Sequence, residues 1–163
     1  MKYLGIGQVA VLVPDLEAAV KDYNEVFGMN FTIVENDDIK MRVAISDGGL
    51  VFAQGYAGAT DLPLQKNWNG DLTAIELRVD DLEEARTRLE AKGCKPVYYL
   101  DAPGGLTEYY MEQLHGIPLT IFQMDSESCV EAIGDNLEDA ANYTPNIVWM
   151  NDYVWMNGET ESS

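Results

Sequence analysis

The chain has 163 residues, 47% of them hydrophobic, and a formal net charge of −18 at pH 7. This length and apolar content are enough for one compact domain, or for two small modules that share a core. The excess of acidic residues argues against binding to nucleic acid or to acidic membrane surfaces, because both need clustered Lys and Arg. Since the N-terminus leads directly into a predicted strand, and no apolar run approaches the roughly 20 residues of a membrane span, we expect a cytoplasmic protein.

The first half of the chain predicts one strand, one helix and then three strands. A nearly continuous apolar run over residues 5–13 indicates a mostly buried strand, which Pro14 ends. Asp15 is a good N-cap, and the residues after it place their apolar side chains along one helical face until Gly28. Three strands are then predicted over residues 31–35, 40–46 and 50–54.

The second half of the chain repeats this order. The motif VPDLEAA at residues 13–19 returns as VDDLEEA at residues 79–85, each time between a strand and a helix that a glycine ends. A repeat of this length is typical of two copies of one module rather than of a solenoid. The second copy predicts a strand over 72–79, a helix over 81–92, and strands over 95–100, 107–112 and 119–123.

Two segments lie outside the repeated modules. The loop between them is longer than most connections, so we interpret it as a linker or a lid. The C-terminal segment is acidic and holds two apolar aromatic runs, 147–150 and 153–156, which we expect to pack on the domain, on a second subunit or over the mouth of a site. The predicted boundaries are 1–55 for the first βαβββ module, 56–70 for the linker loop, 71–124 for the second module and 125–163 for the acidic extension.

Two βαβββ modules, each carrying Val-x-Asp-Leu-Glu-x-Ala at the start of its helix, resemble the vicinal oxygen chelate superfamily. This superfamily includes glyoxalase I, methylmalonyl-CoA epimerase, extradiol dioxygenases and the bleomycin-resistance proteins. The resemblance covers roughly residues 4–124 and implies an α+β fold, in which the two modules form a curved mixed sheet around an open cavity. It also implies a homodimer, an expectation that the aromatic runs of the extension support.

The metal ligands that the resemblance implies are mostly missing from this sequence. Metal-dependent members take His, Glu or Gln ligands from the first and fourth strands of each module. The corresponding positions here are Gln8, Phe52 or Gln54, Ala74 and Thr120. Amides and a hydroxyl bind divalent ions poorly without carboxylate or His ligands. We therefore expect a metal-independent protein without a cofactor.

Glu76 is the candidate catalytic residue. Because side chains alternate along a strand, Glu76 and Arg78 face the cavity if Gln8 and Ala74 do. A carboxylate on an otherwise apolar strand is partly desolvated, which raises its pKa and suits a general acid or base. The alternative interpretation is a salt bridge to Arg78, Arg42 or a neighbouring lysine, or simple surface exposure.

Several other residues are candidates for substrate binding. Arg42 could hold an anionic group or an enolate, or it could be a solvated strand residue. Of the adjacent Tyr109 and Tyr110, one should point inward, where it could bind a ligand or only fill the core. Trp68 is a candidate lid aromatic. The predicted substrate-binding residues are Gln8, Arg42, Phe52, Gln54, Trp68, Arg78, Tyr109, Tyr110 and Thr120.

Two functions remain open at this point. In the first, the protein is a lyase or isomerase whose carboxylate removes a proton next to a carbonyl group of an apolar or aromatic substrate, with Gln8, Gln54, Arg42 or a tyrosine stabilising the oxyanion. In the second, it is a non-catalytic binding protein resembling the bleomycin-resistance proteins, which sequesters a small cationic compound. In both, the partner is a small organic molecule, which we expect to be aromatic.

Overall fold

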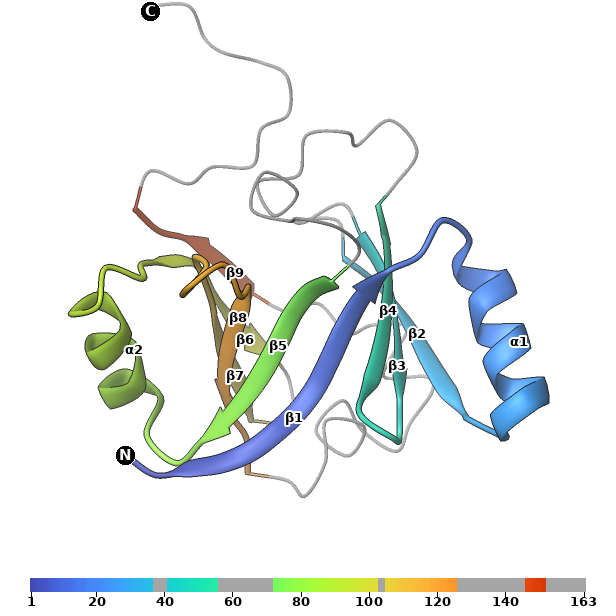
Figure 1. Ribbon diagram of the computed structural model, residues 1–163, viewed down its shortest axis with the longest axis horizontal. Helices are drawn as coiled ribbons and strands as arrows, with labels where there is room; N and C mark the ends of the chain where they lie inside the picture. The colour runs from blue at the N-terminus through green and yellow to red at the C-terminus, as the bar shows by residue number, and fades with distance from the viewer. Residues whose placement is uncertain (37–40, 56–71, 103–104, 126–145, 152–163) are drawn as a thin grey trace, which may run out of the picture.

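The computed structural model describes residues 1–36, 41–55, 72–102, 105–125 and 146–151 (Figure 1). These residues form two helices and one sheet of nine strands in the order β2-β3-β4-β1-β5-β8-β7-β6-β9. Within the described residues, neither helix is long and apolar enough to cross a membrane.

The first module has the predicted order of elements. Asp15 caps α1 by accepting a hydrogen bond from the backbone N–H of Ala18 at 2.9 Å. Gly28 ends the helix in the left-handed conformation, with φ of 68°, which a glycine adopts without steric strain. The elements are β1 (Tyr3–Leu12), α1 (Leu16–Phe27), β2 (Phe31–Asn36), β3 (Met41–Ser46) and β4 (Leu50–Gly55).

The second module repeats this order, and its helix begins in the same way. Asp81 caps α2 by accepting a hydrogen bond from the backbone N–H of Glu84 at 2.9 Å. The helix ends at Glu90, two residues before its predicted end, and Gly93 follows with φ of 83°. The elements are β5 (Leu72–Val79), α2 (Leu82–Glu90), β6 (Pro96–Ala102), β7 (Leu106–Met111) and β8 (Leu119–Gln123).

The two modules join through antiparallel pairing of their first strands. Gln8 of β1 lies opposite Glu76 of β5, and Ala10 lies opposite Ala74. Each first strand also pairs in parallel with the last strand of its own module, β1 with β4 and β5 with β8. The duplicated modules thus build one continuous mixed sheet, with β1 and β5 at its centre (Figure 1).

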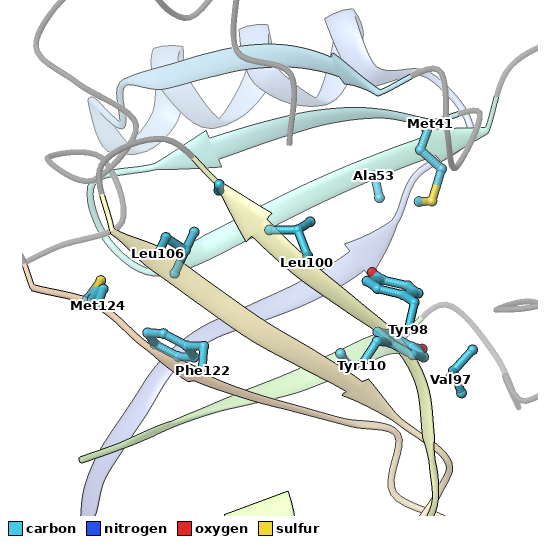
Figure 2. Close-up of a cluster of buried hydrophobic side chains, with 11 residues drawn as sticks. Met41, Ala53, Val97, Tyr98, Leu100, Leu106, Tyr110, Phe122 and Met124 are labelled. Carbon is cyan, nitrogen blue, oxygen red and sulfur yellow. The ribbon is translucent and has the colours of Figure 1, made fainter. Parts of the chain in front are cut away.

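The sheet curls into a half-barrel, and this confirms the predicted fold class. Met41 and Ala53 from the first module pack in one buried cluster with Tyr98 and Tyr110 from the second (Figure 2). We call the face that carries this cluster the inner face. Gly7 leaves room for the ring of Phe122, because a Cβ atom on Gly7 would lie 2.2 Å from Cζ of Phe122.

The helices cover the opposite, outer face of the sheet. Leu16 of α1 packs with Ala44 and Phe52, all of them buried. Leu82 and Ala85 of α2 pack in a second buried cluster that includes Tyr109 and Ile121 among its strand residues. Each strand under a helix therefore has one face toward that helix and one toward the inner face.

Part of the acidic extension belongs to the sheet. Strand β9 (Asn146–Trp149) pairs antiparallel with β6, with Tyr98 opposite Trp149. The backbone N–H of Met150 and the side-chain amide of Asn151 donate hydrogen bonds to the carbonyl oxygens of Val97 and Pro96, both at 2.9 Å. The aromatic run 147–150 thus packs on the domain itself, whereas the run 153–156 lies outside the described residues.

Candidate functional site

One row of side chains crosses the inner face through six neighbouring strands. Each member lies opposite the next in the strand register, so that residues far apart in the sequence become direct neighbours. The members, in spatial order from β1 to β9, are Gln8, Glu76, Thr120, Tyr110, Tyr98 and Trp149. Three of the predicted substrate-binding residues and the predicted catalytic Glu76 thus lie in one line.

A second carboxylate, Glu108 of β7, lies on the inner face beside this row. It is two residues from Tyr110 and opposite Phe122 of β8. Its neighbours Leu106 and Tyr110 belong to the inner-face cluster, so alternation along the strand places Glu108 on the same face. Glu76 and Glu108 therefore project from strands that have only β8 between them.

The environment of both carboxyl groups favours their protonated forms. Burial raises the pKa of Glu76 well above its ordinary value, and the charge of Glu108 raises it further. Burial also raises the pKa of Glu108, from 4.5 to about 7. Like charges close together cannot both ionise easily, so the pair retains a proton near neutral pH.

Neither carboxylate has a hydrogen-bond or ion-pair partner within the described part of the chain. Each residue nevertheless keeps part of its surface accessible to solvent. Arg78, two residues from Glu76 on β5, donates from Nη2 to the carbonyl oxygen of Met124 at 3.3 Å. The carboxylates are thus both desolvated and reachable, which is what proton transfer to a bound molecule requires.

Aromatic rings form one wall beside the carboxylates. The rings of Tyr98 and Tyr110 are stacked, with centroids 5.2 Å apart and planes inclined by 17° (Figure 2). Trp149 meets Tyr98 edge to face at 5.4 Å. Burial, together with the charges of Glu108, Tyr110 and Glu76, raises the pKa of Tyr98 well above its ordinary value. The phenol of Tyr98 therefore stays protonated and can donate a hydrogen bond.

Three predicted substrate-binding residues lie toward the outer face of the first module, which corrects their expected placement. Phe52 is buried against α1, and Gln54, on the same face of β4, donates from Nε2 to the carbonyl oxygen of Pro14 at 2.8 Å. Arg42 forms ion pairs with Glu17 of α1 and Glu35 of β2. The strand register, which the sequence does not reveal, places Ala53 rather than Phe52 on the inner face.

Of the two adjacent tyrosines, Tyr110 points inward and Tyr109 points outward. The hydroxyl of Tyr109 donates to Oε1 of Glu83 on α2 at 2.6 Å. The guanidinium of Arg86 lies over the Tyr109 ring, 5.4 Å from its centroid. Tyr109 thus joins α2 to the sheet and is separated from Glu76 by the sheet itself, while Trp68 lies outside the described residues.

Glu108 is the site residue that the sequence analysis did not identify. The alternation of side chains along the strand could have identified it, because an inward Tyr110 implies an inward Glu108 two residues earlier on the same strand. Glu108 stands among polar and aromatic residues in the sequence, whereas Glu76 stands out on an apolar strand. Only the pairing of β8 with β5 and with β7 reveals that the two carboxylates share one environment.

The residues present do not fit the metal centre of metal-dependent relatives. Ala74 and Phe52 have no donor atom, and Gln54 faces away from the inner face. Within the described ranges, no group of three or more His, Cys, Asp or Glu side chains is arranged to hold a metal ion. At the family's ligand positions only the amide of Gln8 and the hydroxyl of Thr120 remain, a donor set that binds divalent ions weakly.

Comparison with known proteins places the chain in a superfamily. The sequence model of the Glyoxalase/Bleomycin resistance protein/Dioxygenase superfamily matches residues 5–121. The chain belongs to this superfamily. A comparison with curated proteins gives no match.

Solved structures of the same fold include several methylmalonyl-CoA epimerases. The epimerase from Mycobacterium tuberculosis is 19% identical, with a TM-score of 0.59 over 77% of this chain and 91% of that chain. The Streptomyces coelicolor enzyme in complex with 2-nitronate-propionyl-CoA is 16% identical, with a TM-score of 0.60 over 77% and 100%. A hypothetical protein from Bacillus halodurans is 8% identical, with a TM-score of 0.57 over 76% and 96%. At these identities the likeness concerns the fold.

Proposed function

We propose that the protein is a metal-independent enzyme, a lyase or isomerase, that moves a proton on a small organic substrate bound at the inner face. The observation that carries this proposal is the pair of desolvated carboxylates, Glu76 on β5 and Glu108 on β7, which lie on the inner face with only β8 between their strands. The fold neighbours named as epimerases support an isomerase or a related reaction class.

The proposed chemistry uses the two carboxyl groups as one acid/base pair. The ionised member takes a proton from a carbon next to a carbonyl group, and the protonated member returns a proton to the resulting enolate. The amide of Gln8 and the phenol of Tyr98 supply hydrogen-bond donors for the developing oxyanion. The buried aromatic wall favours an apolar or aromatic substrate.

Solvent hydrogen exchange tests this function. Wild-type protein is incubated in deuterium oxide with a panel of small aryl ketones, beginning with phenylacetone, and deuterium uptake at carbon is followed by NMR. Glu76→Gln and Glu108→Gln should each lower the exchange rate by at least about 100-fold, since general acid–base groups contribute about that much. Glu25→Gln is the matched control, because Glu25 is an exposed residue of α1. Equal exchange rates in all four proteins would refute the proposal.

The second candidate is a non-catalytic binding protein for a small cationic compound. Two carboxylates without partners in the described residues, in a chain of net charge −18, support this alternative. Its expected signature is tight ligand binding at the inner face without deuterium uptake by any compound of the panel.

We also propose that the protein forms a homodimer, as expected from the family. Three apolar side chains near the start of β1 support a contact surface there, since Tyr3, Leu4 and Ile6 are 55%, 46% and 60% exposed. Mass measurement in solution tests this, and Ile6→Glu should shift the equilibrium toward the monomer. A monomeric wild-type chain at micromolar concentration would refute the dimer.

A further inference from the structure

We propose that the ligand of the inner face carries a protonated amine, which binds between Glu76 and Glu108, and that anionic compounds such as CoA esters are excluded. This inference rests on the proposed small-molecule site at the inner face, and it holds whether or not that site is catalytic. The proposed ligand class therefore differs from the CoA esters that are bound in some of the structural neighbours.

The first argument is the missing counter-charge. Buried carboxylates in proteins normally have a cation or several hydrogen-bond donors, because burial without them is costly. In the described residues Glu76 and Glu108 have neither. Arg78 is near them in sequence and register, and its Nη2 donates to the carbonyl oxygen of Met124 at 3.3 Å. A cationic ligand would supply the positive charge that the described residues do not.

The second argument is the aromatic wall beside the two carboxylates. The stacked rings of Tyr98 and Tyr110 lie in the same row as Glu76, and the charges of both glutamates act on Tyr98. An ammonium group is attracted both to carboxylates and to the electron-rich faces of aromatic rings. An amine attached to an apolar or aromatic body therefore matches both features of this surface.

The third argument concerns anions. CoA esters carry several phosphate charges, which proteins bind with Arg or Lys. Three of the four arginines that the structure describes form ion pairs on the outer side of the sheet or on α2: Arg42 with Glu17 and Glu35, Arg86 with Glu83 and Glu90, and Arg88 with Glu84. The fourth, Arg78, lies two residues from Glu76 on β5 and donates to the carbonyl oxygen of Met124. An anion at the inner face would therefore meet two carboxylates and, among the described arginines, only Arg78.

Three matched probes test the proposal on the wild-type protein. They are 2-phenylethylammonium, 2-phenylethanol and phenylacetate, which share a benzyl group and differ in charge. Calorimetric titration at about pH 6.5, up to ~10 mM probe, should give an affinity for the ammonium probe at least about tenfold above that for the alcohol, and no binding of phenylacetate. Because the cation favours ionisation of both carboxyl groups, its binding should release a fraction of a proton, measurable in two buffers of different ionisation enthalpy.

Variants localise the effect to the two carboxylates. Glu76→Gln and Glu108→Gln should each lower the affinity for 2-phenylethylammonium by at least about tenfold and reduce the proton release. Glu25→Gln should change the affinity by less than about twofold, since an exposed distant charge contributes little. Thermal unfolding of each variant confirms that it is folded.

Two results would overturn the proposal. One is equal or tighter binding of the alcohol or of phenylacetate, or no binding of the ammonium probe. The other is an affinity for the ammonium probe that neither glutamine variant reduces. The outcome is independent of the exchange assay. Ammonium binding without any deuterium uptake would support this inference and refute the enzymatic function. Glu76-dependent deuterium uptake by ketones without ammonium binding would support the enzymatic function and refute this inference.

Discussion

Glu76 on β5 and Glu108 on β7 project from the same face of the sheet with only β8 between them, and the charge of Glu108 raises the pKa of Glu76. The two residues lie in one module but come from strands on either side of its last strand. The parallel pairing of β5 with β8 and the antiparallel pairing of β8 with β7 create this arrangement.

The carboxylate pair should make the folded state less stable as the pH rises. The pKa of Glu108 in the folded state is about 7, above its ordinary value of 4.5, so the folded protein binds this proton more tightly than the unfolded chain. The free energy of unfolding should therefore be highest below the ordinary pKa and fall as the pH rises toward 7. Urea unfolding at several pH values between these limits measures the slope.

Glu108→Gln should remove much of this slope, because glutamine does not ionise. We expect the variant to be more stable than wild type at about pH 8 by about 1–3 kcal/mol, and Glu25→Gln to follow the wild-type curve. Parallel curves for wild type and Glu108→Gln would mean that Glu108 is not desolvated in the folded protein.

Gly7 should be intolerant of a side chain. A Cβ atom at this position would lie 2.2 Å from Cζ of Phe122, a ring that is 1% exposed and cannot move freely. Gly7→Ala should lower the free energy of unfolding by about 1–3 kcal/mol. Gly48→Ala is the matched control, because the nearest atom to a Cβ there is 3.7 Å away. Recovery of stability in the double variant Gly7→Ala/Phe122→Leu would assign the loss to this contact, and equal losses at Gly7 and Gly48 would contradict it.

The sequence predicted the elements of this fold far better than the faces of its strands. The duplicated motif with Asp15 and Asp81 as N-caps defined both helices and the strand order, because capping and periodicity are local properties. Whether Phe52 or Ala53 faces inward depends on the pairing of β1 with β4, which is not local. The position of Glu108 beside Glu76 could not be predicted for the same reason, since the pairing of strands that are distant in the sequence brings the two residues together.

Trp149 should support the aromatic wall through Tyr98. Its ring meets Tyr98 edge to face at 5.4 Å, and Tyr98 stacks on Tyr110. Trp149→Ala should lower the free energy of unfolding by about 1–3 kcal/mol. It should also lower the pKa of Glu108, because water would reach Tyr98 and the carboxylates beside it. Carboxyl ¹³C NMR titration measures this pKa.

Val148→Ala is the control for Trp149, because Val148 lies next to it on β9, opposite Tyr99, and is 48% exposed. We expect this variant to leave the titration of Glu108 unchanged. If Trp149→Ala lost stability but kept the wild-type titration, Trp149 would have a purely structural role.

The protein as purified, without added metal, should contain well under one divalent ion per chain. The donor set at the family positions is Gln8 and Thr120, with no donor at Ala74, and such sites do not retain metal. A chelator should therefore leave the thermal midpoint unchanged, since metal that binds the folded state would add to its stability. Elemental analysis with and without the chelator makes the measurement. One tightly held ion per chain, with a lower midpoint after chelation, would show that other residues hold a metal and would bring metal-dependent chemistry of the superfamily back into consideration.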